Sequence, residues 1–514
     1  MMRRSALVSG GKRLAETCRL APFFAALAAI SLAAAAPIEA RVDGLQSARS
    51  STGYFSLQQI DGKWSFVGPH GHPFYSIGVA AVTMKGYIDP SGVNLYRDAV
   101  ARKYGTEDAW AAAQRRRFQE WGINTVGAFS NLGPFLNRRI ALTVFIRTAD
   151  DDTDFWDPAW AAHAAAMITR VARRYRDDRN VLGYFIDNEL PWTFALHDLG
   201  RPGRELFIMG RYFHYPAGRP VLLQFLRKRY RSLDDLGADF PGATLRGADW
   251  STLDWSTTTL GAKVTPRGEA TLDAWAGVMA RRYFAVTAGA LRAADPHHLN
   301  LGLKFIGGLT PISVLKAEVP YVDVVSVDFY DTGALSDRRK KPSQKRRARN
   351  FPQTAAQEFE SLILPLIRHD RIVPTSDMLA AWYDLTGKPV LIAEFGYRAA
   401  DSGLPNTIPP GIPVLPDQKA RARAVTNYAD CAIDAPYIIG LQYFQLFDEP
   451  AAGRTLDGEN SNWGLVSGRD VPYSPVTSAL AAAGRLASRR LSRDFRPAPC
   501  TPVGIQDFSE ISRQ

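Results

Sequence analysis

Short apolar runs alternate with helix-length stretches over most of this chain. Eight runs of four to eight residues have the length and the β-branched and aromatic content of buried strands. They are Phe74–Ala80, Asn124–Phe129, Leu142–Arg147, Leu182–Asp187, Leu301–Phe305, Val322–Phe329, Val390–Ala393 and Gly440–Phe444. Helical periodicity predicts helices between them, over Thr106–Glu120, Ala159–Tyr175, Val221–Tyr230, Glu269–Ala294 and Gln418–Ile433.

This alternation predicts an α/β fold. Strands that are apolar on both faces and separated by helices form parallel sheets, and eight such units indicate a closed (β/α)8 TIM barrel, here over residues 73–490. A doubly wound open sheet is the alternative, but it normally carries a glycine-rich phosphate turn after its first strand, and the sequence around Gly78 does not match one. Long loops, 193–268 and 330–388, follow the fourth and sixth strands and would form the rim of the barrel.

The two ends of the chain read differently from the barrel. Residues 41–72 form a lead with a predicted β-hairpin, because alternating residues from Tyr54 turn at Asp61-Gly62 and return from Trp64. Residues 491–514 form an Arg- and Pro-rich tail that we expect to be irregular.

Residues 1–40 resemble a secretory signal. Five basic residues precede an apolar run from Leu20 to Ala36, and small residues end near Ala40. An uncleaved membrane anchor is the alternative, but the run is at the short end for a membrane span. We therefore expect a secreted or periplasmic protein whose contact with a membrane is limited to the signal segment.

Export would leave two cysteines, Cys431 and Cys500. In an oxidising compartment they either form one disulfide or remain two buried thiols. Two cysteines without a histidine cluster do not make a metal site, and we expect neither a metal nor another cofactor.

The formal net charge of the chain is +11. Residues 1–40 hold five basic and two acidic residues, so about +8 remains without them, and the eight basic residues of Arg338–Arg349 account for that excess. A solvated loop is the simple interpretation, and a patch for anionic glycans or a membrane surface is the alternative. We do not expect the rest of the chain to bind nucleic acid.

Two apolar strands end in a glutamate. The first ends Phe185-Ile-Asp187-Asn188-Glu189, and the second reads Pro389-Val-Leu-Ile-Ala-Glu394. Charge is costly at the end of a dry strand, so these residues point to chemistry. In a barrel the fourth and seventh strands face each other across the mouth, where two carboxyl groups could cleave a glycosidic bond.

The Asn188-Glu189 pair and Glu394 resemble the signature of the clan-A retaining glycoside hydrolases. The segments Asp61–Val79, Gly183–Trp192 and Phe225–Leu236 resemble the family-50 β-agarases most, with the family-42 β-galactosidases as neighbours. The resemblance extends over roughly residues 54–485. It implies a TIM barrel and a retaining β-glycosidase that acts on a β-galactoside-containing poly- or oligosaccharide.

The resemblance also implies roles for individual residues. Glu189 would be the general acid and base, and Glu394 the nucleophile that forms a glycosyl-enzyme. Asn188 would bind the sugar 2-hydroxyl, and Tyr330 would orient the nucleophile. Trp192 and Trp463 are further candidates for stacking on a sugar ring. Candidates for hydrogen bonds to sugar hydroxyls are Asn124, Lys304, Gln445, Asp448 and Asn462.

Three other functions stay open at this point. One is an exo-acting enzyme of the β-galactosidase type, and another is a catalytically silent barrel that only binds glycans. The third is a polyanion binder that acts through Arg338–Arg349. The glutamate pair argues against the silent barrel, and deletion of the basic loop would test the polyanion binder.

Overall fold

The computed structural model describes residues 53–195, 205, 207–257, 264–307, 309–330, 376–409, 412–490, 492 and 495. The predicted signal, the basic segment Arg338–Arg349, Cys500 and nearly all of the tail lie outside the described residues. Within them no helix is long and apolar enough to cross a membrane.

A small antiparallel sheet precedes the barrel. β1 (Ser56–Ile60) and β2 (Lys63–Val67) form the hairpin in the segment where alternation predicts one, and β3 (Pro73–Phe74) pairs with β2. Asp61 and Gly62 make the turn with φ of 49° and 76°, a left-handed conformation that glycine adopts without strain.

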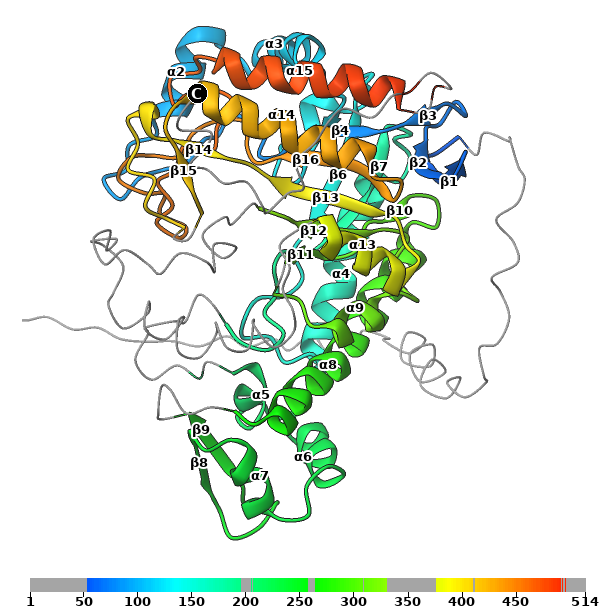
Figure 1. Cartoon of the computed structure of the whole chain (residues 1–514), viewed down its shortest axis with the longest axis vertical. Helices are drawn as coiled ribbons and strands as arrows, with labels where there is room; N and C mark the ends of the chain where they lie inside the picture. Colours follow the sequence, from blue (N-terminus) through cyan, green and yellow to red (C-terminus); the bar gives the residue numbers. More distant parts are fainter. Residues whose placement is uncertain are drawn as a thin grey trace, which may run out of the picture. The chain divides into compact units, whose positions relative to one another are not determined.

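A nine-stranded parallel sheet forms the centre of the molecule (Figure 1). Its order is β10-β7-β6-β5-β4-β16-β13-β12-β11. The strands are β4 (Ser76–Val79), β5 (Thr125–Val126), β6 (Ala141–Ile146), β7 (Val181–Ile186), β10 (Leu299–Asn300), β11 (Lys304–Ile306), β12 (Val325–Asp328), β13 (Val390–Phe395) and β16 (Ile438–Tyr443).

The two ends of this sheet belong to one segment of chain. Only three residues separate β10, which pairs with β7, from β11, which pairs with β12. Between them the Leu301 N–H donates to the Tyr184 carbonyl, and the Gly302 carbonyl accepts from the Ile186 N–H. The sheet therefore curls back onto itself as in a TIM-like barrel, and the predicted α/β fold is confirmed.

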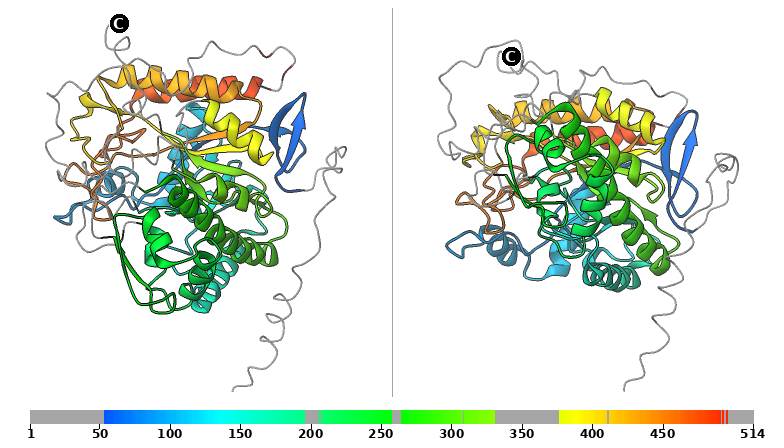
Figure 2. Two further views of the ribbon diagram at one scale, coloured as in Figure 1. Left: turned by 60° about the horizontal axis from the view of Figure 1, so that its bottom comes forward. Right: turned by 90° about the horizontal axis from the view of Figure 1, so that it is seen from below.

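Helices cover the outside of this sheet (Figure 2). The helices that the sequence predicts are present as α3 (Glu107–Glu120), α4 (Pro158–Tyr175), α6 (Arg219–Arg227), α8 (Pro266–Ala294) and α14 (Gln418–Asp434). Four further helices were not predicted from the sequence: α2 (Leu95–Tyr104), α9 (Ile312–Glu318), α13 (Ser376–Thr386) and α15 (Ser474–Arg489). Helix α15 packs along α14.

Polar caps fix where several of these helices begin. The side chains of Thr106, Asp157, Thr265 and Asp417 each accept an N–H from the first turn of α3, α4, α8 and α14, respectively. The caps and the apolar faces were both readable in the sequence.

The long segment after β7 has more structure than the single helix that the sequence predicts within it. It contains α5 (Ile208–Arg211), α6, α7 (Leu233–Asp239) and the antiparallel pair β8 (Ala243–Arg246) and β9 (Asp254–Thr257), which lie near one end of α8 (Figure 1). The stacked rings of Phe213 and Trp255, 5.7 Å apart, anchor this pair.

Cys431 in α14 is disulfide-bonded. This agrees with the disulfide interpretation of the cysteines, whereas Cys500, the partner that the sequence suggested, lies outside the described residues.

Candidate active site

The end of β7 is held in an unusual backbone conformation. Asp187 and Glu189 both have positive φ, 60° and 50°, which non-glycine residues rarely adopt. The Asp187 carboxylate accepts hydrogen bonds from Thr148 N (2.5 Å), Thr148 Oγ1 (2.5 Å), Ala149 N (3.0 Å) and the Tyr283 hydroxyl (2.9 Å). Asp187 thus ties β7 to the loop after β6 and to α8.

Backbone contacts then place the next two residues. Asn188 forms a parallel bridge with Lys304 of β11, and the Glu189 N–H donates to the Lys304 carbonyl at 2.8 Å. The glutamate is therefore fixed by the register between two strands.

Lys304 is the centre of a buried polar network. Its ammonium group donates to Asn188 Oδ1 at 2.7 Å and to Glu394 Oε1, and it lies 3.4 Å from Asp328 Oδ2. The Lys304 and Asp328 side chains are fully buried. The network joins β7, β11, β12 and β13.

Glu394 is bound on both sides. Lys304 contacts one carboxylate oxygen, and the Tyr330 hydroxyl donates to the other at 2.7 Å. Glu394 is only 5% exposed, so these two partners carry most of its stabilisation.

The charges of Glu189 and Glu394 act on the same buried groups, Lys304 and Asp328. Burial lowers the pKa of Lys304, but Asp328, Glu394 and Glu189 raise it, and the net shift is upward. Burial, followed by the charge of Glu394, raises the pKa of Asp328, and Glu189 adds to that shift. The two predicted catalytic glutamates therefore act on one cluster of groups, as a shared site requires.

Glu189 also lines a small open cavity. The other lining residues are Leu190, Pro191, Trp192, Thr193, Phe194, Ile306, Leu309 and Thr310. Trp192 is 4% exposed and packs against Phe155, Tyr283 and Phe284, so it forms a fixed wall. An apolar cavity beside a carboxylic acid suits a leaving group that needs protonation.

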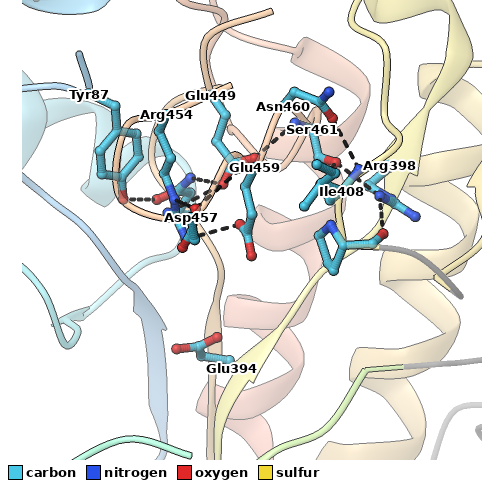
Figure 3. Close-up of polar contacts among 12 residues, drawn as sticks. Tyr87, Glu394, Arg398, Ile408, Glu449, Arg454, Asp457, Glu459, Asn460 and Ser461 are labelled. Carbon is cyan, nitrogen blue, oxygen red and sulfur yellow. Dashed lines mark hydrogen bonds and ion pairs between the residues drawn. The ribbon is translucent and has the colours of Figure 1, made fainter. Parts of the chain in front are cut away.

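A second set of charged side chains follows β16 (Figure 3). Arg454 contacts Glu449 (3.3 Å), Asp457 (2.7 Å) and Glu459 (3.1 Å). In Figure 3 the Glu459 carboxylate lies on the side of this set nearer to Glu394, and the charge of Glu394 contributes to raising the pKa of Glu459, after burial. We call these four residues the Arg454 cluster.

The sequence reading missed the Arg454 cluster as a unit. Nothing in the sequence pattern paired Glu459 with Arg454 and Glu449. Four charged residues within eleven positions after the last strand were the available signal.

Trp463 lies between Tyr330 and the buried side chain of Arg398. Its ring is 5.4 Å from Tyr330, and the Arg398 guanidinium is 5.2 Å from its centroid. Burial lowers the pKa of Arg398 to about 10, while Ser461 Oγ and the carbonyls of Pro409 and Ile412 accept its hydrogen bonds. Trp463 is 1% exposed, so what it offers a sugar is an edge of the wall.

Three predicted sugar-binding residues use their polar atoms internally. Asp448 accepts from Asn462 Nδ2 (2.7 Å), Gly464 N (2.9 Å) and the Tyr473 hydroxyl (2.6 Å). Asn462 Oδ1 accepts from Gln418 and Arg421, and Gln445 Oε1 accepts from Tyr87 at 2.6 Å. These contacts shape the loop after β16, and none of the three side chains is exposed.

The prediction for Asn124 does not fit the structure. Its amide accepts from Ile77 N and donates to the Tyr75 carbonyl, both at 2.9 Å. It precedes β5 and so lies at the start of the strands, away from the end where Glu189 and Glu394 lie. A polar residue at a strand start bonds its neighbour's backbone, which sequence spacing alone did not reveal.

Within the described residues, no group of three or more His, Cys, Asp or Glu side chains has the geometry of a metal site. What the arrangement can do by itself is acid–base and nucleophilic chemistry with carboxyl groups.

Curated relatives of the chain are agarases. It is 24% identical to β-agarase B of Vibrio sp. (strain JT0107) over 83% of this chain and 47% of that protein. It is also 24% identical to β-agarase A of the same strain, over 82% of this chain and 44% of that protein. The chain thus spans less than half the length of these relatives. No family model matches it.

Solved structures show the same fold. An exo-β-agarase superposes with a TM-score of 0.64 at 21% identity, over 86% of this chain and 66% of that one. An agarase, AgWH50C, superposes with a TM-score of 0.62 at 22% identity, over 87% of this chain and 66% of that one. At this identity the likeness establishes the architecture and leaves the chemistry to the site.

Proposed function

We propose that this chain is a retaining β-glycoside hydrolase that acts on an agar-type galactan or on a related β-galactoside. The observation that carries the proposal is the pairing of Glu394, held by Lys304 and Tyr330, with Glu189 at the facing strand end. The names of the similar proteins supply the class of sugar.

The geometry supports a double displacement. Two donors orient the Glu394 carboxylate, so one of its oxygens attacks the anomeric carbon, while Glu189 protonates the departing oxygen. Water then cleaves the ester as Glu189 takes back a proton. Asn188 Oδ1 is occupied by Lys304, which leaves the Nδ2 amide to donate to the 2-hydroxyl of the sugar.

Variants of the two glutamates test the roles. Glu394→Ala should lower kcat on an aryl β-galactoside by roughly 10³-fold or more, because the group that forms the glycosyl-enzyme is lost. Glu189→Gln should slow a substrate with a poor leaving group far more than one whose leaving group needs no proton. Glu318→Gln, a buried carboxyl on α9, is the matched control and should keep wild-type kinetics.

Stereochemistry tests the mechanism independently. Proton NMR of the first product should show the β-anomer, as in the substrate. Release of the α-anomer would exclude Glu394 as a nucleophile.

Two alternatives make different predictions. An exo-acting galactosidase would release single sugars from chain ends, whereas an endo-acting enzyme would shorten agar chains internally, so product length over time separates them. A silent glycan-binding barrel would bind galactan without turnover in the wild type.

We also propose that residues 1–40 direct export, which would place the enzyme with extracellular or periplasmic polysaccharide. Mass spectrometry of the protein recovered outside the cytoplasm should show that this segment has been removed.

A further inference from the structure

Asp328 is a buried carboxylate that depends on one partner. Its side chain is fully buried on β12, 3.4 Å from Lys304 Nζ. Apart from Lys304, neither of its carboxylate oxygens has a hydrogen-bond partner within the described residues. A buried carboxyl group with so little support destabilises the fold, and an apolar side chain would usually pack better.

Lys304 therefore serves two carboxylates, Asp328 and Glu394. In the free enzyme, one ammonium group faces this pair. When Glu394 becomes an ester its charge disappears, and one ammonium then faces one carboxylate. Without Asp328, Lys304 would be a fully buried cation without a carboxylate counter-ion at that stage.

We propose that Lys304 and Asp328 form a charge-compensating pair behind the nucleophile: Lys304 holds the Glu394 side chain in place before attack, and Asp328 holds Lys304 once Glu394 is esterified. This inference rests on the proposed function. It makes both residues positioning residues that act through Glu394, and it replaces the predicted contact of Lys304 with a sugar hydroxyl.

The chemistry balances without proton transfer to or from Lys304 or Asp328. A Glu394 oxygen forms a bond to the anomeric carbon, the bond from that carbon to the leaving oxygen breaks, and the proton of Glu189 goes to that oxygen. In the second half a water oxygen attacks the same carbon, its proton goes to Glu189, and the electron pair of the ester bond returns to Glu394.

The groups that face Lys304 define the expected pH effects. They are Asn188 and Glu189 from the end of β7, Asp328 from β12, Glu394 from β13, and the ring of Phe129, whose centroid is 4.5 Å from Nζ. Tyr330 contacts the other oxygen of Glu394. Lys304→Met removes the cation from this cluster, and Asp328→Asn removes one carboxyl group.

Two variants should therefore move the pH profile in opposite directions. The acid limb of kcat/KM reports the essential base of the free enzyme. Lys304→Met should shift this limb to higher pH and Asp328→Asn should shift it to lower pH, each by roughly one unit or more. A residue that merely fills space would change stability and leave the limb in place.

The glycosyl-enzyme gives a second measurement. With a 2-fluoro aryl glycoside, Asp328→Asn should trap the intermediate more slowly than the wild type, because esterification leaves Lys304 without a counter-ion. Lys304→Met should release the glycosyl-enzyme about tenfold more slowly than the wild type, or slower still, because the Glu394 carboxylate must then re-form beside Asp328. The double variant should recover part of that release rate, whereas additive effects would contradict the pair.

The controls keep the test decisive. Glu318→Gln removes another fully buried carboxyl, one that faces Gly302. This variant should leave the pH profile of kcat/KM unchanged. If Lys304→Met does not fold, the downward shift in Asp328→Asn still tests the pair, and an unmoved limb there overturns it. A wild type without turnover would instead overturn the proposed function.

Discussion

Glu394 is a carboxylate whose two oxygens are bound by side chains from two different elements. Lys304 of β11 contacts Oε1, and Tyr330, just after β12, donates to Oε2. A nucleophile needs one carboxylate orientation, and two donors at opposite oxygens supply it. The sequence marked Glu394, because an acid inside an apolar strand is rare. It could not show that Lys304 faces the carboxylate rather than a sugar.

Tyr330→Phe tests the orientation of the nucleophile. The change removes only the hydroxyl that donates to Glu394 at 2.7 Å. A hydrogen bond to a charged group contributes about 1.5–3 kcal/mol, so kcat/KM should fall roughly 10- to 100-fold while the thermal midpoint changes little. Steady-state kinetics and a melting curve measure the two effects, and an equal loss in both would mean that Tyr330 is mainly a packing residue.

The loop after β16 is the element whose interior the sequence described least well. Asp448, Asn462 and Gln445 all sit in it, and each bonds to protein groups rather than facing the cleft. Polar residues near strand ends look alike in a sequence whether they serve a ligand or hold a loop. The Arg454 cluster and Trp463 border the site only because this loop folds back toward Tyr330.

Asp448 should make the stability of this loop depend on pH. Burial raises its pKa to about 6 from the ordinary value of 3.8, despite the opposing effects of Arg421 and three hydrogen bonds. The folded state therefore binds a proton more tightly than the unfolded state, so the free energy of unfolding should fall as pH rises from about 4 to about 6.

Asp448→Asn should flatten that dependence, which is worth up to roughly 3 kcal/mol. Chemical denaturation of both proteins across this pH range measures it. A wild-type slope that persists in the variant would assign the effect to another group.

At the scale of the whole molecule, the fold depends on the pairing of β10 with β7, through which the curled sheet closes. Gly183 lies opposite Leu299 where β7 meets β10, and a Cβ there would come within 2.5 Å of the Leu299 carbonyl. The same contact sets the register that places Asn188 and Glu189 beside Lys304. Stability and site geometry therefore share one strand pair.

Gly183→Ala should weaken this closure. Overpacking typically costs 1–3 kcal/mol, and here roughly the upper end, because the clashing atom is backbone. Gly289→Ala in α8 is the matched control, since a Cβ there meets nothing within 4 Å and alanine favours helix. Denaturation midpoints should fall for the first variant and hold or rise for the second. Equal midpoints would show that the sheet closes elsewhere.

The sequence by itself determined the alternation of strands and helices, the hairpin turn and the two glutamates. Each depends on local periodicity or on the high cost of a charge in an apolar strand, and both can be read along the chain.

Only the tertiary structure decided what surrounds those glutamates. The role of Lys304, the dependence of Asp328 on it, the place of Asn124 at the far end and the Arg454 cluster all follow from register between strands and from loop folding. These contacts join residues up to hundreds of positions apart, and their energies depend on burial and distance, which spacing along a chain does not encode.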